Sequence, residues 1–136
     1  MRNYAYLAGL LDGEGCFAVY KRKERPPYGY FYTLHLQISG RDLWFLKEIQ
    51  KQFGGKINSA GTSRLSGNSL WYLRFRKEEI LDILPQILPH LIYKKPQAEM
   101  LLKAAHITTR HRFRDYDPSP LENIVLAIKK LKLGIA

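Results

Sequence analysis

Residues 6–15 read Tyr6-Leu7-Ala8-Gly9-Leu10-Leu11-Asp12-Gly13-Glu14-Gly15, and this stretch decides the fold. Asn3 can cap a helix that runs into it. Apolar residues at helical spacing predict one buried face of that helix: Tyr4, Leu7, Ala8 and Leu11. Small residues four positions apart predict a second face, which another helix can approach closely: Ala5, Gly9 and Gly13. Because a glycine inside a helix costs about 1 kcal/mol relative to alanine, we expect such a contact to offset Gly9.

Two acidic residues, Asp12 and Glu14, stand where this helix must end. Gly13 and Gly15 alternate with them, and glycine readily takes the positive φ that turns a chain out of a helix. We therefore expect both glycines to take positive φ and both carboxylates to lie at the helix end.

The segment 7–15 resembles the motif of the LAGLIDADG homing endonucleases, with Leu for Ile, Gly for Ala and Glu for Asp. In that family two motif helices pack together, and the acidic residue at the eighth motif position helps to bind the metals that cleave DNA. The resemblance implies that Glu14 is a metal ligand, that Gly13 supplies a backbone carbonyl beside it, and that the small face is a dimer interface. Taken alone, the segment also fits a buried glycine-containing helix that ends in a charged turn.

The charge of the chain favours a polyanionic partner. The 136 residues include 22 Lys and Arg against 12 Asp and Glu, for a net charge of +10, which points to nucleic acid before membrane. One cysteine, Cys16, excludes an intramolecular disulfide and a multi-cysteine zinc site. Every apolar run is far shorter than the roughly 18 residues that cross a bilayer. We expect one domain over residues 1–136, soluble and intracellular, in the cytoplasm or an organelle.

After the motif the hydrophobic period changes from helical to alternating. Residues 16–25 and 31–39 predict an antiparallel hairpin turned at Pro26-Pro27-Tyr28-Gly29, and residues 56–60 and 70–76 predict a second strand pair around a Gly- and Ser-rich loop. One face of each pair is apolar and the other is polar and basic. A polar, basic face suits readout of base edges in a DNA major groove, although a merely solvated face fits as well. The predicted DNA-contacting residues are Tyr20, Arg22, Thr33, His35, Gln37, Ser39, Asn58, Tyr72 and Arg74.

Helices fill the remaining segments. Asp42 can cap a helix that ends at Gly54-Gly55, residues 77–91 predict a helix kinked or split at Pro85, and another begins at Pro96 and runs to about residue 109. Ser119-Pro120-Leu121-Glu122 predicts the capped start of a last helix, with Gly134 after its end. Trp44 and Trp71 are expected in the core. The predicted order is αββαββ followed by helices.

That order also resembles the family, whose α+β fold (αββαββα) places helices on one face of a curved, antiparallel, four-stranded DNA-binding sheet. The resemblance covers roughly residues 4–105. Residues 91–98 resemble the family segment in which a lysine precedes a Gln-Ala pair, which implies that Lys94 lies near the scissile phosphates; an ordinary surface lysine is the alternative. Where many members have a glutamine after the second strand, this chain has Gly40, so Gln37 or Arg41 would have to substitute.

The resemblance implies a homodimeric endonuclease active in intron homing. One motif per chain supplies one carboxylate, so a second copy would complete the site and each sheet would cover half of a long pseudo-palindromic double-stranded DNA site. The expected cofactor is Mg²⁺, with Mn²⁺ substituting and Ca²⁺ supporting binding without efficient cleavage. Two alternatives remain: an intron maturase that binds RNA, and a DNA-binding regulator that has lost cleavage. The acid at Glu14 argues against the regulator.

Overall fold

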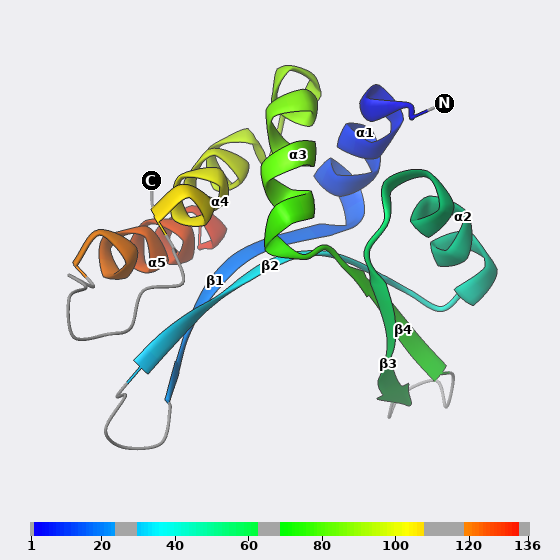
Figure 1. The fold of residues 1–136 in the computed structure, drawn as a ribbon, viewed down its shortest axis with the longest axis horizontal. Helices are drawn as coiled ribbons and strands as arrows, with labels where there is room; N and C mark the ends of the chain where they lie inside the picture. Colours follow the sequence, from blue (N-terminus) through cyan, green and yellow to red (C-terminus); the bar gives the residue numbers. More distant parts are fainter. Residues whose placement is uncertain (1, 24–29, 63–68, 108–118, 134–136) are drawn as a thin grey trace.

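The computed structural model describes residues 2–23, 30–62, 69–107 and 119–133. Five α-helices, four strands and one short 3-10 helix lie in these ranges, and Figure 1 shows their arrangement. Along the chain they are α1 (Tyr4–Glu14), β1 (Gly15–Lys23), β2 (Tyr30–Gly40), α2 (Leu43–Phe53), β3 (Lys56–Thr62), β4 (Ser69–Arg74), α3 (Lys77–Ile87), η1 (Leu88–His90), α4 (Lys95–Ile107) and α5 (Ser119–Lys132). The order predicted from the sequence, αββαββ followed by helices, is confirmed.

The four strands form one antiparallel sheet in the order β1-β2-β4-β3. The sheet curves into an arch whose two arms are the β1–β2 hairpin and the β3–β4 pair (Figure 1). The helices lie along the outer side of the arch, and in the part of the chain that the structure describes no helix is drawn beneath it. This is the α+β fold expected from the family resemblance.

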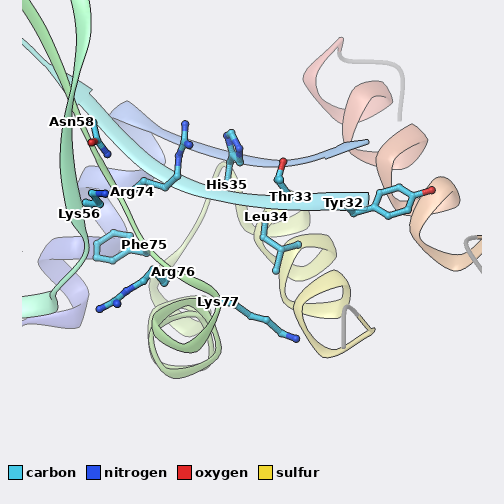
Figure 2. Close-up of a pocket in the computed structure, with 10 residues that line it drawn as sticks. All are labelled: Tyr32, Thr33, Leu34, His35, Lys56, Asn58, Arg74, Phe75, Arg76 and Lys77. Carbon is cyan, nitrogen blue, oxygen red and sulfur yellow. The ribbon is translucent and has the colours of Figure 1, made fainter. Parts of the chain in front are cut away.

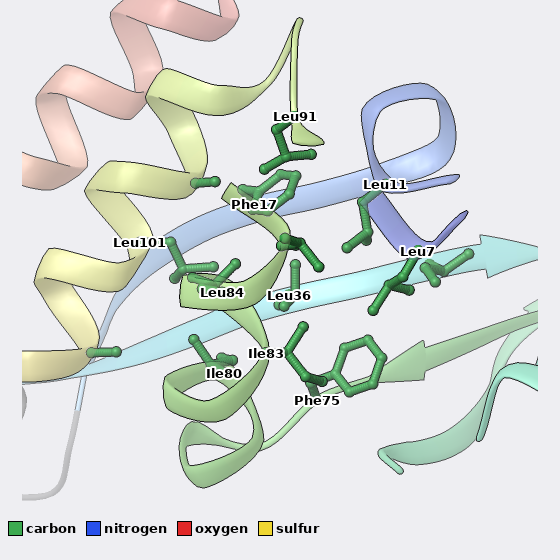
Figure 3. Packing of buried hydrophobic residues seen from close by; sticks show 14 of the residues in the cluster. Leu7, Leu11, Phe17, Leu36, Phe75, Ile80, Ile83, Leu84, Leu91 and Leu101 are labelled. Atoms are coloured by element: carbon green, nitrogen blue, oxygen red, sulfur yellow. The ribbon is translucent and has the colours of Figure 1, made fainter. Parts of the chain in front are cut away.

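The strand register separates an apolar face from a polar one. Phe17 pairs with Leu36, and Ile38 pairs with Leu73, so their side chains share the face that carries the helices. Helices α1, α3 and α4 add residues to the same cluster, including Leu11, and Figure 3 shows these side chains filling the space between sheet and helices. Because strand side chains alternate, the polar residues between these positions must face the concave side.

Helix α1 begins as predicted and ends later than predicted. The Asn3 side chain accepts a hydrogen bond from the backbone N–H of Tyr6 at 3.0 Å, and Leu7 and Leu11 are fully buried. The helix continues through Gly13 to Glu14, and Gly15 is extended at φ −83° and ψ 155°. The expected positive φ at Gly13 and Gly15 is therefore wrong; among the described residues only Gly54, Gly55 and Gly61 adopt it. Strand β1 follows the helix directly, so no left-handed turn is needed.

Three further expectations need correction. Helix α3 continues through Pro85 and ends at Ile87, so the predicted break falls three residues later, at the start of η1. Asp42 is the N-cap of α2, but its side chain makes no capping hydrogen bond.

Trp44 is 68% exposed on α2, although Trp71 packs against the core as expected. Trp44 adjoins Phe45 edge-on, and the side of α2 that faces inward is already filled by Leu46, Ile49 and Phe53.

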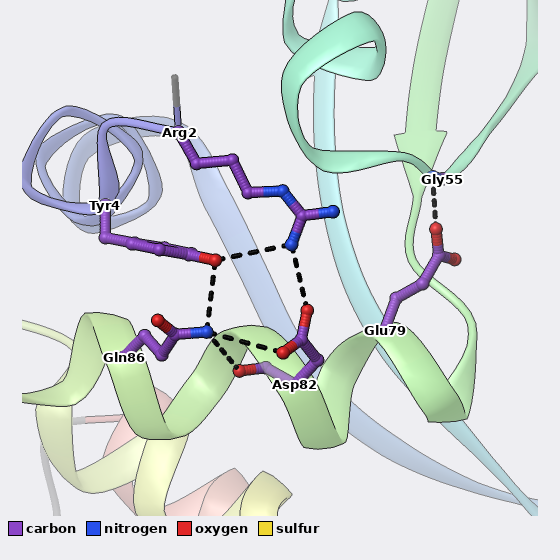
Figure 4. Close-up of polar contacts among 6 residues, drawn as sticks. All are labelled: Arg2, Tyr4, Gly55, Glu79, Asp82 and Gln86. Atoms are coloured by element: carbon purple, nitrogen blue, oxygen red, sulfur yellow. Dashed lines mark hydrogen bonds and ion pairs between the residues drawn. The ribbon is translucent and has the colours of Figure 1, made fainter.

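Polar contacts join the first turn of α1 to α3. Figure 4 shows Arg2 bridging to Asp82 on α3 at 3.0 Å, while Gln86 on α3 donates to the hydroxyl of Tyr4 at 3.0 Å. All of these side chains are at least partly exposed, so each contact contributes little stability. Together with the buried leucines of α1, they orient the helix so that its last turn points at the start of β1.

Helix α5 runs beside the edge strand β1. Lys21 of β1 binds Glu122 at the start of α5 at 2.8 Å, and Lys132 at the other end of α5 lies 3.8 Å from the sulfur of Cys16. A helix in this position covers an edge that could otherwise pair with another strand. Within the described ranges, no helix is long and apolar enough to cross a membrane.

Several predicted features fall outside the described residues. These are the turn at 26–29, the middle of the Gly- and Ser-rich loop at 63–68, the end of the fourth helix at 108–109 and Gly134.

Candidate catalytic site and nucleic-acid interface

Glu14 is the last residue of α1, and its side chain is exposed. The backbone carbonyls of a helix's last turn lack partners within the helix, and Gly13 contributes one of them. Carboxylate and carbonyl oxygens are the ligands that Mg²⁺ and Ca²⁺ prefer. The donor set at the end of α1 therefore fits a divalent cation in kind, but one chain supplies only a single carboxylate here. Among the described residues no group of three or more His, Cys, Asp or Glu could hold a metal ion.

Lys94 reaches this helix end from a distant part of the sequence. Its ammonium nitrogen Nζ donates to the carbonyl oxygen of Gly15 at 2.5 Å, across 79 residues. Its own carbonyl accepts from the N–H of Ala98 at 3.0 Å, which ties Lys94 to the first turn of α4. The structure thus brings Lys94 to the end of α1 that carries Glu14, through a hydrogen bond that the sequence could not specify.

Asp12 fastens the same junction. Its carboxylate oxygen Oδ2 accepts from the backbone N–H of Ile92 at 2.8 Å, and Oδ1 accepts from that of Lys94 at 2.9 Å. Burial alone would raise the pKa of Asp12, but hydrogen bonds from the backbone of Lys94, Ile92 and Tyr93 outweigh it, and the pKa lies below its usual value. Sequence reasoning placed Asp12 at the helix end and gave it no role. An acid in a last helical turn, where the helix dipole disfavours anions, was the available signal.

Gln37 and Arg41 occupy different surroundings. Gln37 pairs with Cys16 across β1 and β2, and its amide oxygen accepts from Arg74 of β4, from Nε at 3.0 Å and from Nη2 at 2.9 Å. Arg41 lies in the exposed turn between β2 and α2. The structure therefore places Gln37 opposite Cys16, two residues after Glu14. Arg41 lies beyond the end of β2.

The residues predicted to contact DNA share the concave face of the arch. Register pairs on this face are Tyr20 with Thr33, Cys16 with Gln37, and Ser39 with Tyr72. Figure 2 shows Thr33 and His35 pointing to one side of β2 and Leu34 to the other. The face carries all of the predicted set: Tyr20, Arg22, Thr33, His35, Gln37, Ser39, Asn58, Tyr72 and Arg74.

Aromatic rings support the two arginines of this face. The guanidinium of Arg22 lies 5.1 Å from the ring centre of Tyr20, and that of Arg74 lies 4.7 Å from the ring centre of Tyr72. Both distances are within the range of cation–π attraction. Where the two arms of the sheet diverge, a hollow of about 530 Å³ is lined by four cationic side chains among others: Lys56, Arg74, Arg76 and Lys77. Arg22, Arg74 and Lys56 give the concave face a positive charge that suits a polyanion, whereas Arg76 and Lys77 lie on the side to which Leu34 points (Figure 2).

His35 is the buried polar residue of the concave face. It is 8% exposed and meets the ring of Tyr20 edge-on, with 4.7 Å between ring centres. Burial, aided by the positive charges of Arg74, Arg22 and Lys132, lowers its pKa to about 4. His35 is therefore neutral at pH 7 and offers one hydrogen-bond donor and one acceptor rather than a charge.

The small face of α1 is bare. Ala5, Gly9 and Gly13 are exposed, and a Cβ atom added at Gly9 or Gly13 would meet no atom of the described residues within 4 Å. The opposite face of the same helix is fully buried at Leu7, Ala8 and Leu11. The fold of one chain thus leaves the predicted dimer interface exposed beside the exposed carboxylate of Glu14.

Comparison with known proteins agrees with this geometry. A family model for LAGLIDADG endonucleases matches residues 7–100. The homing endonuclease I-CvuI, seen with the I-CreI target in 2 mM Mg with the DNA not cleaved, matches with a TM-score of 0.70 and 26% identity over 96% of this chain and 80% of its own. I-SmaMI, a LAGLIDADG homing endonuclease bound to cleaved DNA, matches with a TM-score of 0.68 and 26% identity over 100% of this chain and 44% of its own.

A third structure supports the fold alone. The archaeal intron-encoded homing endonuclease I-Vdi141I, complexed with DNA, matches with a TM-score of 0.64 and 20% identity over 96% of this chain and 97% of its own. Chains that are similar to this one therefore include one of nearly the same length and one more than twice as long.

Proposed function

Because the chain belongs to the LAGLIDADG endonuclease family, we propose that it is a site-specific DNA endonuclease that acts as a homodimer. It binds a long pseudo-palindromic double-stranded DNA site and makes a staggered cut by metal-dependent hydrolysis. The observation that carries this proposal is the bare small face of α1 beside the single carboxylate Glu14. One chain supplies one acid to the site, and no described residue covers the adjacent small face of α1. A second copy of the chain would supply a second acid and cover that face.

Two-fold symmetry supplies that copy. In a symmetric dimer the same surface meets itself, so Ala5, Gly9 and Gly13 face their equivalents and the two Glu14 carboxylates come together. This chain spans 44% of I-SmaMI, so two copies provide a comparable length of protein. The exposed side chain of Tyr6, 48% accessible, lies on the same helix and would rim the contact.

Glu14 from each protomer and the carbonyl of Gly13 would hold Mg²⁺, or Mn²⁺ in its place, because both present oxygen at a solvent-accessible helix end. When bound there, a divalent metal would activate a water and offset charge on the leaving oxygen. Lys94 holds a positive charge one residue from Glu14, where it stabilises negative charge that develops on the phosphate. Ca²⁺ supports DNA binding without efficient cleavage because its flexible coordination orients water less strictly.

The concave face binds the DNA. Its basic and aromatic residues point away from the core, and the arch of the sheet follows a convex double helix. Arg74 is held by Gln37 through its Nε and Nη2 atoms, so its Nη1 can meet a base edge or a phosphate. We assign Gln37 to orienting Arg74, because it accepts two hydrogen bonds from that guanidinium, and Arg41 to the rim of the interface, because it lies in the exposed turn after β2. Which of the two stands in for the family's glutamine stays a prediction.

The test replaces Glu14 with glutamine, which keeps the shape of the side chain and removes the charge that a hard cation requires. Purified wild-type protein with Mg²⁺ and DNA carrying the insertion site of its own gene should yield a staggered double-strand break. Glu14→Gln should abolish that break and retain binding in a mobility-shift assay. Its binding should be indifferent to Mg²⁺ and Ca²⁺, whereas both ions should tighten wild-type binding by relieving the repulsion between the two carboxylates.

Glu78→Gln is the matched control, because Glu78 is also exposed in a helix but lies in the first turn of α3. It should cut like the wild type. Cleavage by Glu14→Gln at a near wild-type rate would refute the metal-ligand assignment. Binding to the intron RNA without any DNA cleavage by the wild type would point to a maturase, and DNA binding without cleavage would point to a regulator.

A further inference from the structure

Asp12 is the second acid of the motif stretch, and it takes part neither in the proposed metal binding by Glu14 nor in the proposed charge stabilisation by Lys94. It lies two residues before Glu14 on α1. Residues two apart on an α-helix point to nearly opposite sides, so Asp12 cannot join Glu14 on one metal ion. Both of its oxygens are already occupied by backbone N–H groups from the segment that precedes α4.

That segment has little else to hold it. The side chain of Leu91 is buried and the helix beyond begins at Lys95. Between them, Ile92 is 87% exposed and Tyr93 is 77% exposed, so both side chains lie largely in solvent. Backbone hydrogen bonds to Asp12 and the bond from Lys94 Nζ to the carbonyl of Gly15 therefore hold this short connection.

The same segment delivers Lys94 to the site. The N–H of Lys94 is bound by Asp12, while its Nζ is bound by the carbonyl of Gly15, one residue beyond Glu14. A lysine side chain is a flexible four-carbon stem, and fixing both its backbone and its ammonium group removes most of that freedom. We propose that Asp12 is a positioning residue, whose carboxylate clamps the backbone of residues 92–94 and thereby holds the Lys94 ammonium beside Glu14.

Without its hydrogen bonds, the carboxylate of Asp12 would lower the stability of α1. A negative charge in the last turn of a helix is disfavoured by the helix dipole, and Glu14 adds a like charge nearby. Two charge-assisted hydrogen bonds offset that cost. They join α1, which carries Glu14, to the segment that carries Lys94, so the two groups keep a fixed position relative to each other.

The experiment compares Asp12→Asn, Lys94→Met and the double variant, and it rests on the proposed endonuclease activity. In Asp12→Asn one acceptor oxygen becomes an NH₂ donor that faces another N–H, so the clamp fails. We expect single-turnover cleavage at saturating protein to fall about 10- to 100-fold, the size of loss seen for residues that orient the ligands of a metal site. DNA affinity and the dimer, measured by mobility shift and sedimentation, should be retained.

The double variant is decisive because a positioning residue acts only through its target. Asp12→Asn should cost cleavage no more than about twofold once Lys94 is methionine, since coupled residues are not additive. Equal losses in both backgrounds would overturn the proposal. So would unchanged cleavage by Asp12→Asn in the wild-type background.

Glu79→Gln is the structural control. Glu79 also accepts two backbone N–H groups, from Gly55 at 2.5 Å and from Arg76 at 2.8 Å, but it fastens the loop between α2 and β3 to α3 (Figure 4). The substitution should lower stability without changing cleavage by folded dimer. If it slows cleavage as much as Asp12→Asn does, the effect is general loosening and the proposal fails.

Amide hydrogen exchange supplies a readout that needs no cleavage. Asp12→Asn should speed exchange at Ile92 and Lys94 and leave the amides of Gly55 and Arg76 unchanged, with the reverse result for Glu79→Gln. Unchanged exchange at Ile92 and Lys94 would refute the clamp even if the endonuclease activity is real. Faster exchange in a protein whose wild type never cuts would support the clamp and refute the proposed function. If Asp12→Asn does not fold, Asp12→Glu keeps the charge, displaces it by one methylene and carries the same comparisons.

Discussion

Gly9 and Gly15 lie six residues apart in the same stretch, and the contacts of the chain explain only one of them. A Cβ atom at Gly15 would lie 2.6 Å from the carbonyl oxygen and 2.8 Å from the Cα of Leu11. A Cβ atom at Gly9 would meet nothing within 4 Å among the described residues. Gly15 is small because the chain crowds it where α1 meets β1. Gly9 is small although no described part of the chain crowds it.

This difference distinguishes a glycine that the fold of one chain requires from a glycine that the proposed dimer would require. Gly15 is explained by the contacts of one chain, whereas Gly9 costs helix stability and gains nothing from the residues around it. The proposed dimer supplies the missing reason, because a second α1 can use the space above Gly9. Substitutions at these two glycines therefore test the comparison directly.

The largest expected effect is that of Gly9→Leu. Inserting a large side chain into a close helix contact costs about 1–3 kcal/mol, and a two-fold axis inserts it twice. Leucine also favours the helix over glycine, so the monomer should stay folded. We expect a folded monomer by sedimentation and circular dichroism, with double-strand cleavage lost. A Gly9→Leu protein that remains a cutting dimer would remove the distinction between the two glycines.

Gly15→Ala should have the second largest effect, on folding itself. The atoms that its methyl group would meet include the backbone of Leu11, which cannot rotate away as a side chain can. We expect the free energy of unfolding, measured by denaturant titration, to fall by about 1–3 kcal/mol. A wild-type value would mean that α1 and β1 can move apart at no cost, and that the short distances at Gly15 do not constrain the fold.

The smallest effect is expected for Gly9→Ala, with the opposite sign. An alanine inside an exposed helix stabilises it by about 1 kcal/mol relative to glycine, and no atom of the described residues obstructs the added methyl group. Titrations at several protein concentrations separate folding from assembly. The monomer should become more stable, and any loss should appear in the free energy of dimerisation alone. A destabilised monomer would show that Gly9 serves the fold after all.

Much of the fold was predictable because its signals are local. Asn3 caps α1 as expected, Leu7 and Leu11 are buried as their spacing indicated, and the alternation along β1 and β2 placed polar residues on one face. Local signals failed where a residue's neighbours decide its role. The positive φ expected at Gly15 rested on glycine's freedom, but the tertiary structure uses its lack of a side chain.

The sequence by itself determined the order of the elements, the face that each buries, the basic concave surface and the family, because periodicity, charge and a short motif are written in consecutive residues. Only the tertiary structure decided which distant groups meet. Asp12 binds the N–H of Lys94 across 82 residues, and Gln37 binds Arg74 across 37. A pattern along the chain fixes which side of a helix or strand is buried, whereas the partner on that side depends on how whole elements pack, and no local pattern encodes that choice.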